Sequence, residues 1–305
     1  MDSPAGVIVK LTLVALIWGG SFIAGRVTAL EMSAPAAALW RYLVATIMLV
    51  AILLLRERSW PRLSSRQWIG VVLLGLTGVV AYNLCFIYGL ETVQASRGSL
   101  ILALNPAATM IGAALFLHEP LTLTKTSGIG LAFLGVAVEL SGGNPLTLLH
   151  GGAGAGEIAL FGSAISWAAY TLIAKRITVN VSPLAITTYA AFAGTVMLAI
   201  ISSVQGNLLV VPKVSFGAWT SLAYMGSFGT AVAFVWFLEG VQRLGSARAA
   251  VFINLVPVAA IALGALLLDE RITVPMIIGA AMVITGVWIL NRPAPLVPAR
   301  APNPS

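Results

Sequence analysis

Ten long apolar runs divide the chain, with short polar or glycine-rich segments between them. Each run has about 20 residues, the length at which an α-helix crosses the hydrocarbon core of a bilayer. The pattern therefore predicts an all-α integral membrane protein with ten transmembrane helices. The runs are 7–28, 34–55, 67–90, 95–117, 122–141, 156–177, 182–204, 214–240, 245–268 and 273–291.

The second half of the chain repeats the first with an offset of about 151 residues. Pairs in this register include Trp68 with Trp219, Gly75 with Gly226, Arg97 with Arg248, Pro106 with Pro257 and Glu119 with Glu270. Near the N-terminus the register shifts by about two residues, so that Trp18 lies over Trp167. Each unit holds five spans, an odd number, so the second unit must enter the membrane inverted. We expect a first five-helix repeat at 1–141, a linker loop at 142–155, a second, inverted repeat at 156–291 and a disordered cytoplasmic tail at 292–305.

Composition and charge place the whole chain in a membrane. It is 59% hydrophobic and 9% charged, whereas about a quarter of the residues of soluble domains are charged. The ten spans leave no room for a soluble catalytic or nucleic-acid-binding domain, so the net charge of +7 is not a nucleic-acid patch. A cleaved signal peptide would also explain the first run, but its match to 156–177 favours a retained helix.

The basic residues instead orient the helices, because cytoplasmic loops are enriched in Lys and Arg. With both termini in the cytoplasm, only Arg26, Arg97, Lys213 and Arg271 fall at outer ends, and Arg41 lies within a span. The inner segments then hold Lys10, Arg56, Arg58, Arg62, Arg66, Lys125, Lys175, Arg176, Arg243, Arg248, Arg292 and Arg300. Inverted repeats with this layout are typical of alternating-access transporters, in which the two copies exchange conformations.

Several motifs resemble one known family. They are the run from Trp18 to Phe22, Pro35 with Arg41 and Tyr42, the segments 105–106 and 254–257, and the loop glutamates Glu119 and Glu270. Over residues 7–291 the chain resembles the EamA branch of the drug/metabolite transporter superfamily, and within it is most similar to YddG-type exporters of aromatic and other amino acids. The resemblance implies efflux across a bacterial inner membrane through a central cavity. It also implies that the fifth and tenth spans are peripheral.

Glycine and proline are placed alike in the two repeats. Gly128 and Gly135 share a face of the fifth span, and Gly279 and Gly286 repeat that spacing in the tenth, which permits close helix packing. Pro106 and Pro257 lie within the fourth and ninth spans, where each removes a backbone hydrogen bond and frees a carbonyl. Paired interruptions of this kind indicate a transport site or gate; a kink that only shapes the bundle is the alternative.

Aromatic and polar side chains mark the predicted cavity wall. Helical spacing brings them onto shared faces within the first, third, sixth and eighth spans, and several differ from their repeat counterparts, as a site for an asymmetric solute requires. Packing in the bundle core or in a lipid-facing aromatic belt is the alternative for each. The predicted substrate-binding residues are Trp18, Ser21, Tyr82, Asn83, Phe86, Ser99, Trp167, Tyr170, Trp236 and Asn254.

Charged candidates inside the spans are few. Arg41 can meet a substrate carboxylate, or its side chain can reach the headgroups at the outer end. Glu239, and less directly Glu139, are the acids available for proton exchange. Glu119 and Glu270 indicate structural roles at helix ends. Two histidines cannot supply a three-His metal centre, and with Cys85 as the single cysteine no internal disulfide forms, so we expect neither metal nor cofactor.

Together these features predict a transporter and not an enzyme, because no nucleophile with a base, paired acids or His cluster is present. We expect export of neutral amino acids, aromatic ones included, or of similar metabolites. The expected partners are a small amino-acid-like substrate and membrane lipid, with no nucleic acid, and the protein itself is a monomer or dimer. A nucleotide-sugar, nucleobase or drug carrier of the same superfamily, or a proton-coupled antiporter, is the alternative.

Overall fold

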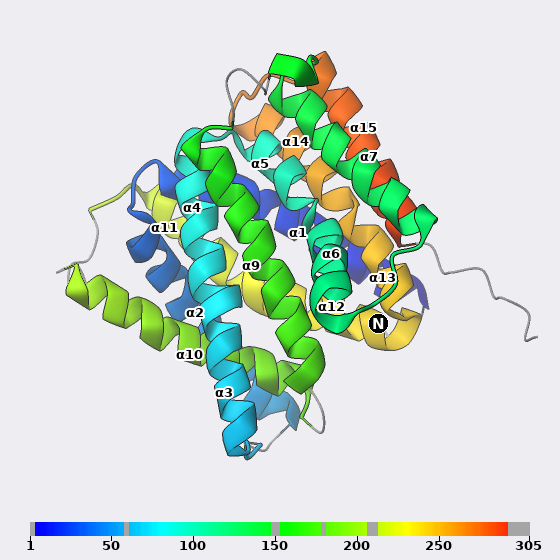
Figure 1. Ribbon diagram of the computed structural model, residues 1–305. Coiled ribbons are helices and arrows are strands. Elements are labelled where there is room, and N and C mark those ends of the chain that lie inside the picture. Colours follow the sequence, from blue (N-terminus) through cyan, green and yellow to red (C-terminus); the bar gives the residue numbers. More distant parts are fainter. Residues whose placement is uncertain (1–3, 58–60, 148–152, 178–180, 206–212, 292–305) are drawn as a thin grey trace, which may run out of the picture.

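The computed structural model describes residues 4–57, 61–147, 153–177, 181–205 and 213–291, and the expected tail at 292–305 lies outside them. Ten helical spans form one bundle (Figure 1), as the hydrophobic runs predict. Nine helices in this part of the chain are long and apolar enough to cross a membrane, and a tenth, Val274–Leu290, is shorter but apolar. A helix suits each span because it satisfies its own backbone hydrogen bonds away from water.

Six spans are single helices and four are composite. The single ones are α1 (Pro4–Ala29), α2 (Ala34–Glu57), α7 (Leu123–Leu140), α9 (Ala155–Ile177), α10 (Pro183–Val204) and α15 (Val274–Leu290). Two composite spans contain a π-helical turn: α3 (Ser65–Leu74), η1 (Gly75–Ala81) and α4 (Tyr82–Thr92); and α11 (Phe216–Tyr224), η3 (Met225–Val232) and α12 (Ala233–Leu244). Two are broken: α5 (Ala95–Leu102) with α6 (Asn105–Leu117), and α13 (Ser246–Ile253) with α14 (Leu255–Leu267). A short 3₁₀ turn, η2 (Pro145–Thr147), follows α7.

Local structure repeats with the sequence. Ser64 and Ser215 are N-caps whose hydroxyl oxygens accept from N–H groups of α3 and α11, and Thr122 and Thr273 do the same for α7 and α15. The left-handed residues His118 (φ 55°) and Asp269 (φ 52°) also correspond. The two π-helical turns correspond over 75–81 and 226–232, the second beginning one residue earlier at Met225, and such turns are frequent at functional sites.

The helices of the two broken spans are interrupted near Pro106 and Pro257, as the sequence predicts. Pro106 falls in the first turn of α6, where its missing N–H costs nothing, since that N–H would have no helical partner. The chain leaves the helix at residues 103–104. In the second repeat the break falls at Asn254, three residues before Pro257. Each repeat therefore carries one discontinuous helix.

A two-fold relation between the repeats is visible in their contacts. The hydroxyls of Thr46 and Thr195, which are 149 residues apart and correspond to each other, lie 2.8 Å apart. A residue that contacts its own counterpart lies on the two-fold axis. In α7 and α15, side by side in Figure 1, a Cβ on Gly128 would lie 2.7 Å from the carbonyl oxygen of Gly286, and one on Gly135 would lie 2.7 Å from that of Gly279. This confirms close packing of the glycine faces.

The loops gather at two ends of the bundle. We call the Glu270 end the one with loops 30–33, 93–94 and 268–273, and the Glu119 end the one with loops 61–64, 118–122 and residue 245. At the Glu270 end, α1 packs on α4 and α5, and α5 packs on α14. The corresponding pairs, α9 with α12 and α13, and α13 with α6, show no comparable packing among the described residues.

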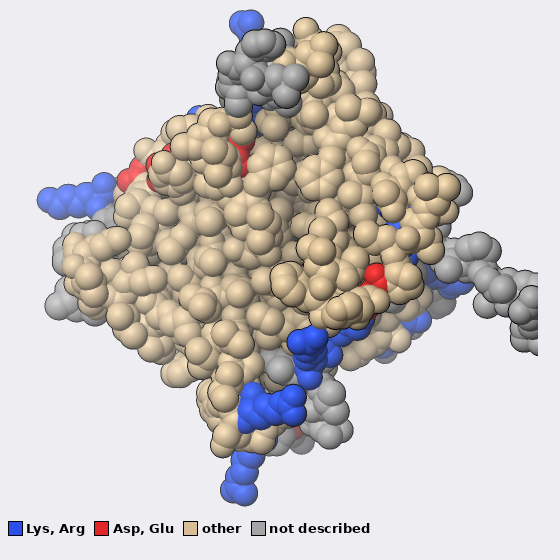
Figure 2. Space-filling view, viewed as in Figure 1, with Lys and Arg blue, Asp and Glu red and all other residues tan. Residues whose placement is uncertain are grey.

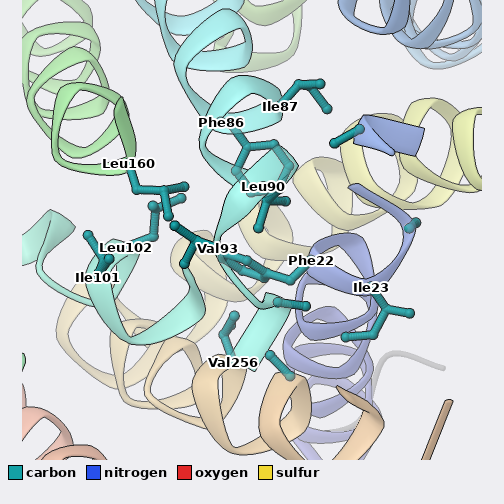
Figure 3. Packing of buried hydrophobic residues seen from close by; sticks show 14 of the residues in the cluster. Phe22, Ile23, Phe86, Ile87, Leu90, Val93, Ile101, Leu102, Leu160 and Val256 are labelled. Atoms are coloured by element: carbon teal, nitrogen blue, oxygen red, sulfur yellow. The ribbon is translucent and has the colours of Figure 1, made fainter. Parts of the chain in front are cut away.

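The core at the Glu270 end explains this tight closure. Phe22, Phe86, Leu90, Leu160 and Val256, from four different helices, are buried against one another (Figure 3). Phe22 and Phe86 meet edge to face, with ring centroids 5.3 Å apart. The two ends of the bundle are therefore unequal: the Glu270 end is closed by a continuous apolar core.

The outer surface agrees with a membrane environment. In Figure 2 the broad middle of the face carries almost no Lys, Arg, Asp or Glu, and the charged residues gather at its margins. Large apolar side chains are exposed on the surface of the described residues, among them Leu55, Phe116 and Leu266. Lipid tails are the environment in which such a surface has no cost.

Candidate substrate site

Aromatic rings from both repeats form a continuous chain through the middle of the bundle. Trp18 of α1 contacts Phe237 and Phe234 of α12, with centroids 5.4 and 5.9 Å apart. Trp167 of α9 contacts Phe234 at 6.0 Å and Tyr82 of α4 at 5.4 Å. Four elements from the two halves thus meet at these rings.

The chain of rings continues on either side of Trp167. Tyr170 stacks on Trp167 at 5.3 Å, and Tyr82 stacks on Phe86 at 5.9 Å with nearly parallel planes. Of the predicted site residues, Trp18, Tyr82, Phe86, Trp167 and Tyr170 therefore lie together.

A small cavity opens beside this cluster, between the repeats. Its wall combines Trp167, Tyr170 and Phe234 with Tyr42 of α2 and with two hydroxyls, those of Thr187 in α10 and Thr230 in η3. Gly78 and Gly229 allow the close approach that shapes this region: a Cβ on Gly78 would meet the Tyr170 ring, and one on Gly229 would lie 2.7 Å from Ser21 Oγ. An apolar wall with a few hydroxyls has the composition of a small-molecule pocket, but the cavity measures about 20 Å³, far below the roughly 300–1,000 Å³ of a pocket that encloses a ligand.

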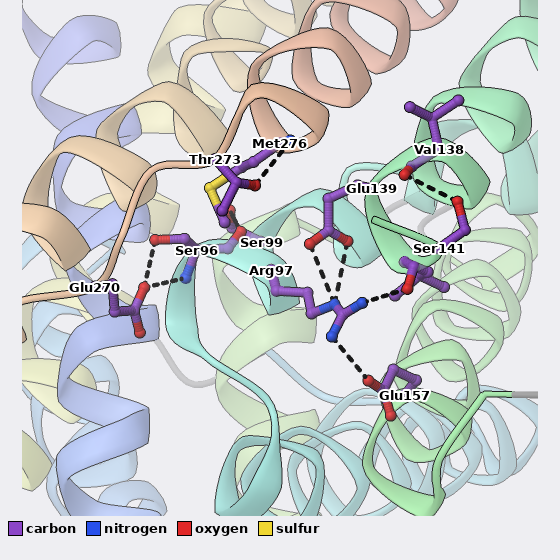
Figure 4. A network of polar contacts seen from close by, with 11 residues as sticks. Ser96, Arg97, Ser99, Val138, Glu139, Ser141, Glu157, Glu270, Thr273 and Met276 are labelled. Atoms are coloured by element: carbon purple, nitrogen blue, oxygen red, sulfur yellow. Dashed lines mark hydrogen bonds and ion pairs between the residues drawn. The ribbon is translucent and has the colours of Figure 1, made fainter. Parts of the chain in front are cut away.

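Three predicted polar residues are committed to backbone groups. Asn83 is fully buried; its Nδ2 donates to the Val79 carbonyl at 2.7 Å, and its Oδ1 has no hydrogen-bond partner. The Ser21 hydroxyl donates to Ile17 O at 2.9 Å, and the Ser99 hydroxyl donates to Ser96 O at 2.6 Å. Ser99 lies in α5, near the Glu270 end (Figure 4).

Two further predicted residues stand apart from the ring cluster. Trp236 is half-buried and makes none of the ring contacts described above, in contrast to its neighbour Phe237. Asn254 is half-buried at the break between α13 and α14. Adjacent residues on a helix point about 100° apart, so Trp236 and Phe237 face different directions. Spacing within that one helix does not say which of the two directions faces the cluster.

Arg41 is buried and does not take the orientation toward the headgroups, one of the two expected for it. The residue is 8% exposed, so the side chain does not extend to a headgroup region. Its guanidinium lies 5.7 Å from the Tyr42 ring centroid and 5.9 Å from that of Phe86. Nη2 donates to Thr230 Oγ1 at 3.3 Å, while Nε has no partner. A positive charge thus lies next to the cavity wall.

The other charged candidates form ion pairs near the ends. Glu239 accepts from Lys10 at 2.7 Å and from Arg56 at 2.5 Å, which joins α1, α2 and α12. A second hollow, lined by Arg56, Glu57, Glu239 and Gln242, lies there. At the opposite end Arg97 pairs with Glu139 at 3.1 Å (Figure 4). Neither acid lies beside the aromatic cavity.

The corresponding loop glutamates differ in their contacts. Glu270 is 9% exposed and caps α5: it accepts from the N–H groups of Ala95 at 2.7 Å and Ser96 at 2.9 Å, and from the Ser96 hydroxyl (Figure 4). Glu119 has a 36% exposed side chain and bonds to Lys175 at 2.5 Å. That hydrogen bond and the lysine charge lower the pKa of Glu119. The structural role expected of Glu270 is confirmed.

Sequence reasoning missed Phe234 and Thr230. Phe234 connects Trp18 and Trp167, and Thr230 connects Arg41 to the cavity. The sequence did carry a signal for Phe234, because its counterpart in the first repeat is Asn83, so the two repeats differ at this position. The counterpart of Thr230 is Val79, so the repeats differ there too.

The fold and site define a polytopic membrane transporter of two inverted five-helix repeats around a central cavity. A family model confirms this class and names it: residues 6–140 and 154–292 each match the EamA-like transporter family. The chain belongs to that family. The two matches coincide with the two structural repeats.

Relatives over nearly the whole chain are also transporters. The uncharacterized transporter YyaM of Bacillus subtilis is 28% identical over 90% of this chain and 89% of its own length. A probable terminal-alkyne amino-acid exporter of Streptantibioticus cattleyicolor is 28% identical over 92% of both chains. The uncharacterized inner membrane transporter YedA of Escherichia coli is 26% identical over 93% of this chain and 90% of its own. One crystal structure shares the fold, with a TM-score of 0.65 at 16% identity over 94% of this chain and 96% of that one.

Proposed function

We propose that this protein exports neutral amino acids, aromatic ones included, by alternating access across a bacterial inner membrane, in the manner of YddG-type exporters. The observation that carries the proposal is the cavity between the repeats, lined by Tyr42, Trp167, Tyr170 and Phe234 with the hydroxyls of Thr187 and Thr230. Aromatic walls suit apolar and aromatic side chains, and hydroxyls suit the polar backbone of an amino acid. A relative that carries an amino-acid exporter's name supports the same class.

The charge of the site disfavours larger anionic substrates. Nucleotide sugars carry several negative charges and need several cations, whereas Arg41 is the one Lys or Arg among the described residues whose side chain bonds to the cavity wall. Proton coupling also finds little support, because Glu139 and Glu239 are held in ion pairs away from the cavity. We therefore favour transport that depends weakly or not at all on a pH gradient.

Counterflow into proteoliposomes tests the proposal. Vesicles loaded with unlabelled phenylalanine, methionine, threonine, glutamate, lysine or a nucleotide sugar are compared for uptake of labelled phenylalanine. We expect the three neutral amino acids to drive uptake, because a missing contact in an apolar pocket costs only about 1–3 kcal/mol. Faster exchange with glutamate, lysine or the nucleotide sugar would refute the substrate class. Concentrative uptake that requires a proton gradient and is lost in Glu239→Gln would refute uncoupled transport.

A further inference from the structure

Arg41 is a buried cation without an acidic partner. The half-buried Lys10 and Arg97 each bond to a glutamate, and the half-buried Arg26 donates to the Leu90 carbonyl. For Arg41, no carboxylate oxygen in the described part of the chain lies within 4.0 Å. Its contacts are two aromatic faces and one 3.3 Å hydrogen bond. Burial of a charge without a counter-ion is costly, so a bound anion would stabilise this guanidinium.

The position of Arg41 connects that charge to the cavity. Thr230 accepts from Arg41 Nη2 and also lines the cavity beside Trp167 and Phe234. Ala190 is the counterpart of Arg41 in the second repeat, at the same 149-residue offset that pairs Thr46 with Thr195. The charge is therefore absent from the other half of the scaffold, as expected where a ligand without two-fold symmetry binds.

We infer that the guanidinium of Arg41 binds the carboxylate of the transported amino acid, an inference that rests on the function proposed above. A guanidinium matches a carboxylate with two parallel hydrogen bonds, and Arg41 Nε has no partner in the protein. One cation balances the single charge of a carboxylate, whereas a phosphate ester carries about two. The side chain of the amino acid then lies against the rings of Trp167 and Tyr170.

Competition against phenylalanine counterflow tests which group is recognised. Phenylalanine amide keeps the ring and the amine but has no carboxylate, and 3-phenylpropionate keeps the ring and the carboxylate but has no amine. We expect 3-phenylpropionate to compete and the amide to be at least about tenfold weaker than phenylalanine, the loss that follows from one charge-assisted hydrogen-bonded pair. Arg41→Gln should raise the half-saturation concentration for phenylalanine at least about tenfold and remove the preference for acid over amide. Arg248→Gln, at an exposed arginine, is the matched control.

Thermal unfolding separates a binding role from a structural one. Because Arg41 has no acidic partner among the described residues, Arg41→Gln should melt at the same temperature as the parent or above it, while phenylalanine should no longer raise that temperature. If phenylalanine is transported and Arg41→Gln keeps the preference for acids, the carboxylate site is wrong and the function stands. If only 3-phenylpropionate moves, in an Arg41-dependent way, the site stands and the proposed function is wrong.

A second inference rests on the unequal glutamates. Glu270 caps the N-terminus of α5 at the end where α5 packs on α14. By the repeat, Glu119 corresponds to Glu270, and Ser246 and Ala247 at the start of α13 correspond to Ala95 and Ser96. At the Glu119 end the helix pair α6 and α13 shows no comparable packing, and Glu119 bonds to Lys175 of α9.

We propose that Glu119 and Glu270 are alternating caps, one for each open state of the cavity. In the state described here Glu270 holds α5 and closes the Glu270 end. In the opposite state Glu119 leaves Lys175 and accepts from the first N–H groups of α13, while Glu270 releases α5. A carboxylate is suited to this exchange because it accepts several N–H bonds at a helix N-terminus and interacts favourably with the helix dipole.

Distances between spin labels report the two ends separately. Labels at Gln94 and Arg271 measure the Glu270 end, and labels at Phe116 and Gln242 measure the Glu119 end; all four residues are exposed, and Cys85 is replaced by Ala. We expect Glu270→Gln to lengthen the first distance and shorten the second. Glu119→Gln should remove the short population of the second distance that substrate otherwise produces. Asp269→Asn is the matched control, because Asp269 is exposed and Asn tolerates its left-handed backbone.

Two outcomes would overturn the alternating caps. One is that Glu270→Gln leaves both distance distributions unchanged. The other is that Glu119→Gln shifts both distances in the same direction as Glu270→Gln does. If Glu270→Gln does not fold, the half-buried Glu119 still decides the question, because Glu119→Gln must lose the substrate-induced short distance.

Discussion

Individual side chains in this protein divide into those that hold helices together and those that face the cavity, and Trp167 belongs to the second group. It contacts Tyr82, Tyr170 and Phe234 but is only half-buried. We expect Trp167→Leu to lower phenylalanine counterflow about tenfold, since an aromatic pair contributes about 0.5–1.5 kcal/mol beyond its buried area. The melting temperature should change little, because Leu keeps part of the apolar volume.

Trp68 provides the comparison for this substitution. It is a tryptophan of α3 that lies 44% exposed at the Glu119 end, contacts Tyr189 and is not among the residues that line the cavity. Trp68→Leu should leave counterflow near the parent value. Equal loss of transport and folded yield in both variants would mean that the Trp167 cluster is packing alone.

At the same scale, Glu31 gives a pH-dependent contribution to stability. It accepts from the hydroxyl and the N–H of Ser215, both at 2.7 Å, and the hydroxyl bond followed by the N–H bond holds its pKa below the ordinary 4.5. A lowered folded-state pKa stabilises the protein above the unfolded-state pKa and loses that effect as pH falls through the folded value. We therefore expect Glu31→Gln to lower the melting temperature slightly at pH 7 and to match the parent once the pH has fallen below the lowered folded-state pKa of Glu31. A difference that persists unchanged at low pH would contradict the role of its charge.

At the scale of helices, the contact between α7 and α15 depends on backbone approaching backbone. A Cβ on Gly135 would lie 2.7 Å from the carbonyl oxygen of Gly279 and 2.9 Å from the N–H nitrogen of Val283, neither of which can move alone. We expect Gly135→Val to reduce the yield of folded protein and to lower its melting temperature by several degrees, because overpacking costs about 1–3 kcal/mol.

Gly130 on the same helix is the control for that substitution. A Cβ there meets nothing within 4 Å, so Gly130→Val should fold and melt like the parent. Melting in detergent by a fluorescence-detected size-exclusion assay compares the two. If Gly135→Val is tolerated as well as Gly130→Val, the two helices can separate without loss.

How far sequence predicts the helices follows from the same contacts. The hydrophobic runs give the spans to within a few residues, and Pro106 and Pro257 give the two breaks, because both signals are local. The π-helical turns at 75–81 and 225–232 have no such local mark. Likewise, Arg41 could not be oriented from its own span, since the partner that holds it is Thr230, which lies 189 residues away.

At the scale of the whole molecule, the orientation in the membrane is still a prediction. The distribution of Lys and Arg puts both termini in the cytoplasm and the linker outside. In a Cys85→Ala background, an impermeant thiol reagent should label a cysteine at the exposed Ala153 in intact spheroplasts. A cysteine at the exposed Thr124, on the other side, should be labelled only after permeabilisation. The reverse result would invert every statement about inside and outside while leaving the fold unchanged.

The repeat predicts the scaffold better than it predicts the site, and the reason is physical. Residues that build both halves alike, such as Gly128 and Gly279, recur at the fixed offset. Residues that bind one asymmetric solute must differ between halves, and lipid-facing drift produces differences too. Differences between the repeats therefore pointed to Tyr170 and Trp236 equally. Only the fold shows that the Tyr170 ring lies in the aromatic cluster and that the Trp236 ring stands apart from it.

The contact between Thr46 and Thr195 has a consequence for how the transporter changes conformation. If the two halves exchange conformations during transport, a contact between two non-equivalent residues is replaced by the contact between their counterparts in the other repeat. A residue that contacts its own counterpart keeps the same neighbour. The same invariance holds for the reciprocal glycine pairs of α7 and α15. Under such an exchange these places would stay fixed while the rest of the bundle tilts about them. Natural variation that strengthens or rigidifies them can thus raise stability without slowing the cycle, whereas equal strengthening at Glu119 or Glu270 cannot.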